Sequence, residues 1–187
     1  QGDRTGDENL IDMVKDYLKE KYKKPGNVFL GLVHRLDKPV QGIVLFGKTS
    51  KGASRLSEQF RDHTIQKTYH AIVLGKLKES RGEIKEKINK ISFFAEGFTE
   101  KSDEELLQEI KKATKTRTAE LSWEVVKSND KYSLVKVMPK TGRFHQIRIQ
   151  MANMGHSILG DTKYGFQSRS PNHRTEWSDR NSIALAA

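Results

Sequence analysis

Two segments of alternating hydrophobic and polar residues constrain the fold of this 187-residue chain most strongly. In residues 118–126, one face of an extended strand collects the hydrophobic side chains of Ala119, Leu121, Trp123 and Val125. Residues 132–138 form a second segment of this kind, and Asn129-Asp130 between them supplies a turn. The sequence therefore predicts an antiparallel hairpin.

Other apolar runs and helical spacings predict the remaining elements. Strands are expected at residues 28–33, 42–48, 67–74 and 183–186. Helices are expected at residues 7–23 with Asp7 as cap, from Thr49-Ser50 to about Arg61, and from Gly142 to Gly155. Residues 77–117 are polar and charged and are interpreted as an insertion, with a capping box at Ser102 and Glu105. These elements predict an α+β domain on a mixed sheet.

Composition narrows the classes of partner. The formal net charge of +10 favours a polyanion, nucleic acid above all, over a merely soluble basic protein. No apolar run approaches 18 residues and no signal-peptide pattern is present, which argues against a membrane protein. The chain has no Cys, which excludes disulfides and thiolate nucleophiles and fits a cytoplasmic protein. Its six His residues show no metal-ligand spacing.

A carboxylate on a turn is the first candidate for chemistry. Asp37 ends the stretch His34-Arg35-Leu36-Asp37, and Pro39 and Gly42 force a turn before the next strand. From these four residues alone, an ion pair of Asp37 with Arg35, or an Asp that caps the turn, is the favoured explanation. The run from Gly42 to Thr49 also matches the phosphate-loop pattern, but Ile, Val, Leu and Phe fill its interior and favour a strand.

Arg148 is the second candidate. It lies in the middle of the helix predicted after Gly142, next to the apolar stripe that contains Ile147. An Arg in this position needs an anionic partner or water, unless its side chain reaches the surface. Tyr69 lies on a predicted strand face with Ala71 and Val73, and from this position alone a purely structural Tyr is the default interpretation.

Three stretches, in this order, resemble the motifs of the RluA-like family of pseudouridine synthases. They are His34-Arg35-Leu36-Asp37 with Gly42; Lys67-Thr68-Tyr69-His70-Ala71; and Thr141 to Arg148, leading to Gly160-Asp161-Thr162-Lys163-Tyr164-Gly165. The resemblance covers most of residues 28–165, although Gln150 stands where the family usually has His. It implies one pseudouridine synthase domain over residues 1–187, with a mainly antiparallel sheet, a central catalytic cleft and a short strand missing at each end.

The resemblance also implies an activity. Members of this family isomerise chosen uridines in ribosomal or transfer RNA, without cofactor or metal, and are usually monomers. Asp37 is then the nucleophile, attacking either the base or the sugar, and a buried Arg148 offsets the cost of burying its charge. Tyr69 stacks on the uracil and assists proton transfer at C5.

The remaining assignments concern substrate binding. Ile147 is expected to line the pocket, and the RNA-facing candidates are Arg35, Lys67, Arg143 and His145. Two alternatives stay open: a non-catalytic RNA-binding module of the same fold, and a phosphate-loop NTPase.

Overall fold

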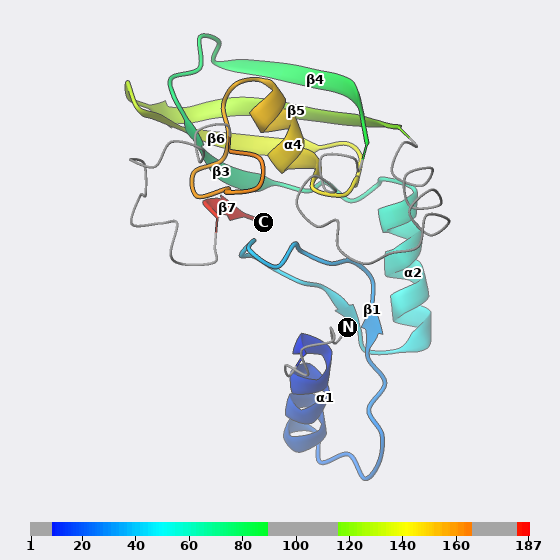
Figure 1. The fold of residues 1–187 in the computed structure, drawn as a ribbon. Coiled ribbons are helices and arrows are strands. Elements are labelled where there is room, and N and C mark those ends of the chain that lie inside the picture. Colours follow the sequence, from blue (N-terminus) through cyan, green and yellow to red (C-terminus); the bar gives the residue numbers. More distant parts are fainter. Residues whose placement is uncertain (1–8, 90–115, 166–182) are drawn as a thin grey trace, which may run out of the picture. The chain divides into compact units, whose positions relative to one another are not determined.

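The computed structural model describes residues 9–89, 116–165 and 183–187, which form two compact units (Figure 1). The first unit takes its described residues from Gln1–Leu36 and Ile43–Ile65, and the second takes them from Asp37–Gly42 and Gln66–Ala187. A single domain over residues 1–187 stays a prediction. Within the described ranges, no helix has the length and apolar character that crossing a membrane requires.

The first unit contains two helices and a two-stranded sheet. Helix α1 (Leu10–Lys21) begins later than predicted, because the side chain of Asn9 accepts hydrogen bonds from the first backbone N–H groups and caps it. The predicted cap, Asp7, lies outside the described residues. Helix α2 (Ser50–Arg61) is capped by Thr49, as predicted. Strands β1 (Gly31–Leu32) and β2 (Phe46–Gly47) pair antiparallel and are shorter than predicted.

The phosphate-loop pattern has a packing explanation in this unit. A Cβ atom on Gly47 would lie 2.5 Å from the backbone of Ala53 in α2, so the glycine lets the helix approach the strand closely. The backbone N–H of Leu45 donates to Nε2 of His34 at 2.9 Å. Gly47 itself is paired with Gly31 in the sheet. Leu45 and Gly47 are thus engaged within the fold, which argues against a free loop that cradles phosphate.

A five-stranded antiparallel sheet dominates the second unit. Its strands, β3 (Tyr69–Leu74), β4 (Arg81–Ile88), β5 (Arg117–Ser128), β6 (Tyr132–Pro139) and β7 (Leu185–Ala186), lie in the order β4-β5-β6-β3-β7. The hairpin of β5 and β6 is confirmed. Its turn is closed by the side chain of Asn129, which accepts from the N–H groups of Lys131 and Tyr132. The β7 pairing confirms the predicted C-terminal strand.

Strand β4 was not predicted. It lies inside residues 77–117 and pairs along the outer edge of β5, with Ile84 opposite Leu121. Its sequence is mostly charged, as is common for edge strands that must not pair with other molecules, and a charged strand hides the apolar alternation. The predicted capping box at Ser102 and Glu105 lies outside the described residues.

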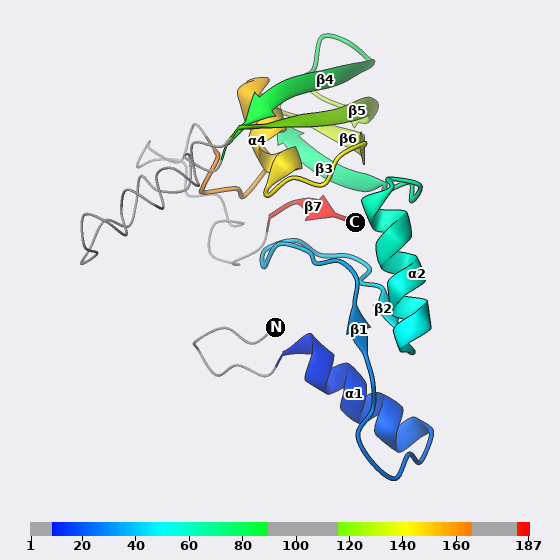
Figure 2. The ribbon, with the colours of Figure 1, turned by 90° about the vertical axis from the view of Figure 1, so that its right-hand side faces the viewer.

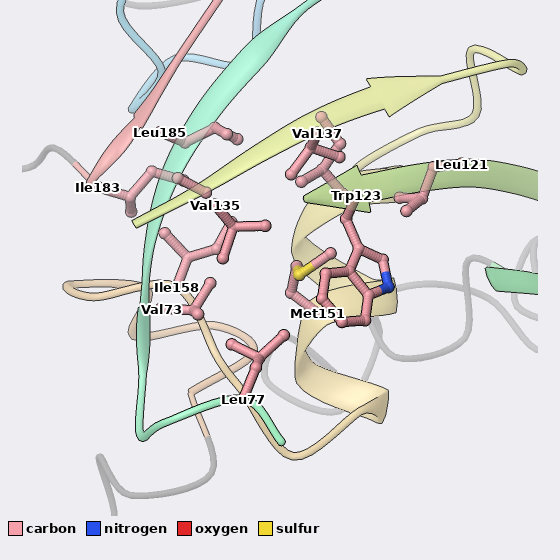
Figure 3. Close-up of a cluster of buried hydrophobic side chains, with 12 residues drawn as sticks. Val73, Leu77, Leu121, Trp123, Val135, Val137, Met151, Ile158, Ile183 and Leu185 are labelled. Atoms are coloured by element: carbon pink, nitrogen blue, oxygen red, sulfur yellow. The ribbon is translucent and has the colours of Figure 1, made fainter. Parts of the chain in front are cut away.

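Helix α4 (Gln146–Asn153) packs on one face of the sheet (Figures 1 and 2). It is shorter than the predicted segment from Gly142 to Gly155, and its residues from Gln146 to Met151 are all buried. The core lies between α4 and the sheet, where Met151 points toward the side of the sheet that carries Trp123 (Figure 3). Because the helix is buried from Gln146 to Met151, a charge in this stretch has no water to solvate it, which matters for Arg148.

The segment that carries Asp37 is fastened to β7. The N–H of Gln41 donates to Leu185 at 3.3 Å, and the N–H of Ala187 donates back to Gln41 at 3.0 Å. Gly42 has a φ of 148°, and a Cβ atom there would lie 2.7 Å from Ala187. Residues 37–42 therefore belong to the sheet unit, although the chain on either side of them belongs to the other.

We expect Met151→Ala to destabilise the second unit by about 2–5 kcal/mol, because the deletion leaves a cavity between α4 and the sheet. The matched control is Met13→Ala, whose side chain is half exposed and whose loss should cost less than about 0.5 kcal/mol. Urea denaturation followed by tryptophan fluorescence and circular dichroism measures both. Equal stability of the two variants would contradict this account of the core.

Candidate active site

Arg148 is buried on α4 and held by a carboxylate that follows the helix in the chain. Its Nε donates to Oδ2 of Asp161 at 2.6 Å, and its Nη2 donates to Oδ1 at 2.9 Å. Only 6% of the Arg148 side chain and 1% of the Asp161 side chain are exposed. A two-pronged, charge-assisted pair of this kind is strong and fixes the plane of the guanidinium group. The sequence predicted that Arg148 needs an anionic partner, and its main anionic partner in the structure is Asp161.

Asp37 is the second carboxylate beside Arg148. Its Oδ2 lies 3.7 Å from Nη1 of Arg148, and its side chain keeps 29% of its surface exposed. Burial disfavours the charged form of Arg148, but the hydrogen bonds and charge of Asp161, with smaller help from Asp37, raise the pKa of Arg148 above its ordinary value. Arg148 is thus a permanent cation that faces Asp37 with its third nitrogen.

A tight turn positions Asp37, as the sequence predicted. The N–H of Val40 donates to the backbone carbonyl of Asp37 at 2.9 Å and closes the turn. The carbonyl of Pro39 in turn accepts from the N–H of Ile183, just before β7. Asp37 therefore stands at the start of a turn that hydrogen bonds fix internally and to the segment before β7.

Tyr69 begins β3 and lies half-buried against the core cluster that contains Ile147. Burial raises the pKa of the Tyr69 phenol, and the negative charge of Asp37 raises it further. The phenol stays protonated at neutral pH and can donate a proton. The predicted face of β3 is also confirmed, since Ala71 and Val73 on the same side are fully buried.

His145 lies beside Asp37 and is largely buried. Its Nε2 is 3.7 Å from Oδ2 of Asp37, and its Nδ1 is 2.8 Å from the hydroxyl of Tyr164. The residue adopts a left-handed conformation, with φ of 50°, directly before α4. Burial lowers the pKa of His145 to about 4, with the charges of Arg148 and Lys163 contributing, so the ring is neutral at pH 7. The ring also stacks on Phe144, with centroids 3.7 Å apart.

The other predicted binding residues lie in different surroundings. Lys67 donates through Nζ to the carbonyl of Thr141 at 3.2 Å, and burial lowers its pKa. Arg143 donates through Nε to the carbonyl of Thr118 at 3.0 Å. Ile147 is buried in the core, and Arg35 is an exposed residue of the first unit. In the second unit the structure thus brings together Asp37, Arg148 and His145, with Tyr69 close enough to sense the charge of Asp37.

Two residues of this cluster received no role from the sequence. Asp161 and Tyr164 belong to the last matching stretch, and the ring of Tyr164 lies 5.0 Å from the guanidinium carbon of Arg148. The signal for Asp161 was present, because a buried Arg requires an anion and Asp161 is the acidic residue that follows it most closely. In the described parts of the chain, no group of three or more His, Asp or Glu side chains could hold a metal ion.

The depressed pKa of His145 predicts a pH dependence of stability. The folded pKa of about 4 lies below the ordinary value of 6.5, so the unfolded chain binds a proton more readily than the folded one between these values. The free energy of unfolding therefore decreases by up to about 3 kcal/mol as the pH falls from 6.5 to 4. His145→Asn, which tolerates the left-handed backbone, should remove this loss.

The matched control is His70→Gln, at an exposed position on β3. Urea denaturation at pH 7, 5.5 and 4 measures the difference between each variant and the parent protein. A difference for His145→Asn that does not change with pH would contradict a buried, neutral imidazole.

Comparison with known proteins identifies the family. A family model described as RNA pseudouridylate synthase matches residues 4–153. The chain is 37% identical over 137 residues to tRNA pseudouridine synthase C of Vibrio cholerae, which covers 71% of this chain and 54% of that protein. It is 36% identical over 164 residues to an uncharacterized RNA pseudouridine synthase of Aquifex aeolicus, which covers 86% of this chain and 48% of that protein.

A solved structure shares the fold. Human RNA pseudouridylate synthase domain containing 4 matches with a TM-score of 0.76 and 24% identity, over 97% of this chain and 74% of that chain. The chain spans about half the length of the curated relatives it matches. The match of the family model over most of the chain confirms the resemblance carried by the three motifs: the chain belongs to the RNA pseudouridylate synthase family.

Proposed function

We propose that this chain carries the catalytic site of an enzyme that isomerises specific uridines in RNA to pseudouridine, with Asp37 as the nucleophile. The observation that carries the proposal is the position of the Asp37 carboxylate. It lies 3.7 Å from both Arg148 and His145, yet keeps 29% of its surface exposed. A carboxylate beside a permanent cation stays ionised, and its exposed part can meet a substrate.

The reaction makes a definite demand on such a site. The bond from N1 of uracil to C1′ of ribose must break, the base must turn, and C5 must bond to C1′ while its proton is lost. Asp37 attacks either the sugar or the base and holds the intermediate covalently. Tyr69 stacks on the uracil. Its phenol is already protonated, so the C5 proton passes to a water molecule, and the phenol assists by hydrogen bonding to that water.

Arg148 acts on Asp37, whereas the surrounding basic residues bind the RNA backbone. Arg148 is buried and acts on Asp37, while Ile147 fills the space behind the base. Lys67, Arg143 and Arg35, together with the net charge of +10, hold the phosphate backbone while the target uridine is flipped out of its stack. His145 lines the approach to Asp37 as a neutral hydrogen-bonding group.

Ribosomal and transfer RNA both fit this chemistry, and transfer RNA is the substrate we favour. The support is that several relatives, 34–39% identical to this chain, are named tRNA pseudouridine synthase C. We further propose that the enzyme acts in the cytoplasm as a monomer without metal or cofactor. Analytical ultracentrifugation and turnover in the presence of EDTA test the last two points.

Asp37→Asn should lower turnover by at least about 10³-fold, because the amide cannot act as the nucleophile. Tritium release from transfer and ribosomal RNA transcripts labelled at C5 of uridine measures the reaction, and filter binding measures RNA affinity. The affinity should stay within about twofold, since the phosphate backbone is held by other charges. Asp130→Asn, in the exposed hairpin turn, is the matched control and should behave like the parent.

Three results would count against the proposal. Release that survives Asp37→Asn would exclude Asp37 as the nucleophile. RNA binding without release from any transcript would support a non-catalytic RNA-binding module. Mg²⁺-dependent nucleotide binding that is lost on Lys48→Ala would support the phosphate-loop alternative.

A further inference from the structure

Arg148 faces two carboxylates that are bound in very different ways. Asp161 is almost fully buried and accepts four hydrogen bonds: two from the Arg148 guanidinium and two from the backbone N–H groups of Lys163 and Tyr164, each at 3.1 Å. Asp37 makes a longer contact of 3.7 Å with Nη1 and is partly exposed. Asp161 is therefore the fixed partner of Arg148, and Asp37 is the exchangeable one.

The proposed reaction removes the charge of the exchangeable partner. An oxygen of Asp37 forms a bond to a carbon of the substrate. Attack at C1′ breaks the bond to N1, whose electron pair leaves with the uracil; attack at C6 moves the electron pair of the C5–C6 double bond toward O4. On either route the negative charge moves from Asp37 to the uracil.

This transfer of charge creates a problem for a buried cation. If Asp37 were the sole partner of Arg148, its covalent bond to the substrate would leave a buried cation without a bound anion, which is strongly unfavourable. Asp161 does not bond to the substrate in this reaction and keeps its two hydrogen bonds to Arg148 throughout. The Arg148 guanidinium therefore keeps Asp161 as its counterion at every step, including those in which the negative charge has moved from Asp37 to the uracil.

We propose that Asp161 is a positioning residue that keeps Arg148 charged and oriented while Asp37 exchanges its charge for a covalent bond. This inference rests on the proposed function of Asp37. The turn that follows Asp161 supports it, because the same turn places the ring of Tyr164 on Arg148 and its hydroxyl on His145. One short loop therefore reaches both side chains that flank Asp37.

The first test needs no RNA. It is a double-mutant cycle of Asp161→Asn and Asp37→Asn, measured by urea denaturation at pH 7. Asp37→Asn alone should change the unfolding equilibrium constant less than about fivefold, because Asp161 still pairs Arg148. Asp161→Asn should raise it at least about 100-fold, and the double variant should exceed the product of the single effects at least about tenfold. Additive effects would overturn the inference.

The second test separates positioning from folding. Under conditions where Asp161→Asn is folded by circular dichroism, single-turnover tritium release from a transfer RNA transcript should slow at least about tenfold, at an RNA affinity within twofold of the parent. A full rate in the folded variant would leave Asp161 a structural role only. If Asp161→Asn does not fold, Asp161→Glu replaces it; that variant keeps the charge but shifts it by one methylene, and an unchanged rate would overturn the inference.

The two tests distinguish this inference from the proposed function. No release by the parent protein from any RNA defeats the proposed function, and with it the step that Asp161 is proposed to serve. Release by the parent together with an additive cycle defeats only the role of Asp161. Asp130→Asn is again the control and should match the parent in both measurements.

Discussion

The buried pair of Arg148 and Asp161 is the interaction on which the candidate site depends. Taking two charges out of water is costly, and this pair recovers the cost through two parallel hydrogen bonds and two further bonds from the backbone to Asp161. It fixes a cation in the buried part of α4, at a point where the cation can reach Asp37. The buried charge thus has a structural cost, and in the proposed reaction it also has a chemical role.

Three parts of the sheet unit meet around the Asp37 carboxylate. Asp37 arrives on a turn hydrogen-bonded to the segment around β7, Tyr69 arrives at the start of β3, and Arg148 arrives on α4. The strands and the helix share one hydrophobic core, so their side chains hold their relative positions without help from a ligand (Figure 3). The site is therefore built on packed strands and a packed helix. Of its two carboxylates, Asp37 is partly exposed to solvent and Asp161 is buried.

Much of this arrangement could be predicted from the sequence, and the failures have physical reasons. Local sequence patterns predicted four features: the turn at Asp37, the β5–β6 hairpin, the inward face of β3, and the need of Arg148 for an anion. They did not predict the identity of that anion, because Asp161 reaches Arg148 through the path of the chain after α4. Strand β4 was missed because its charged edge sequence hides the alternation, and the left-handed His145 because tertiary packing imposes it.

The most direct test of the account is the solvent exchange of the Arg148 Nε–H, observed by nitrogen-15 NMR of the arginine side chains. The account predicts exchange at least about 100-fold slower than that of the exposed Arg61, and the same slow exchange in Asp37→Asn, because Asp161 accepts this proton. The protection should disappear in Asp161→Asn. Fast exchange in the parent protein, or protection that is lost with Asp37 and kept without Asp161, would contradict it.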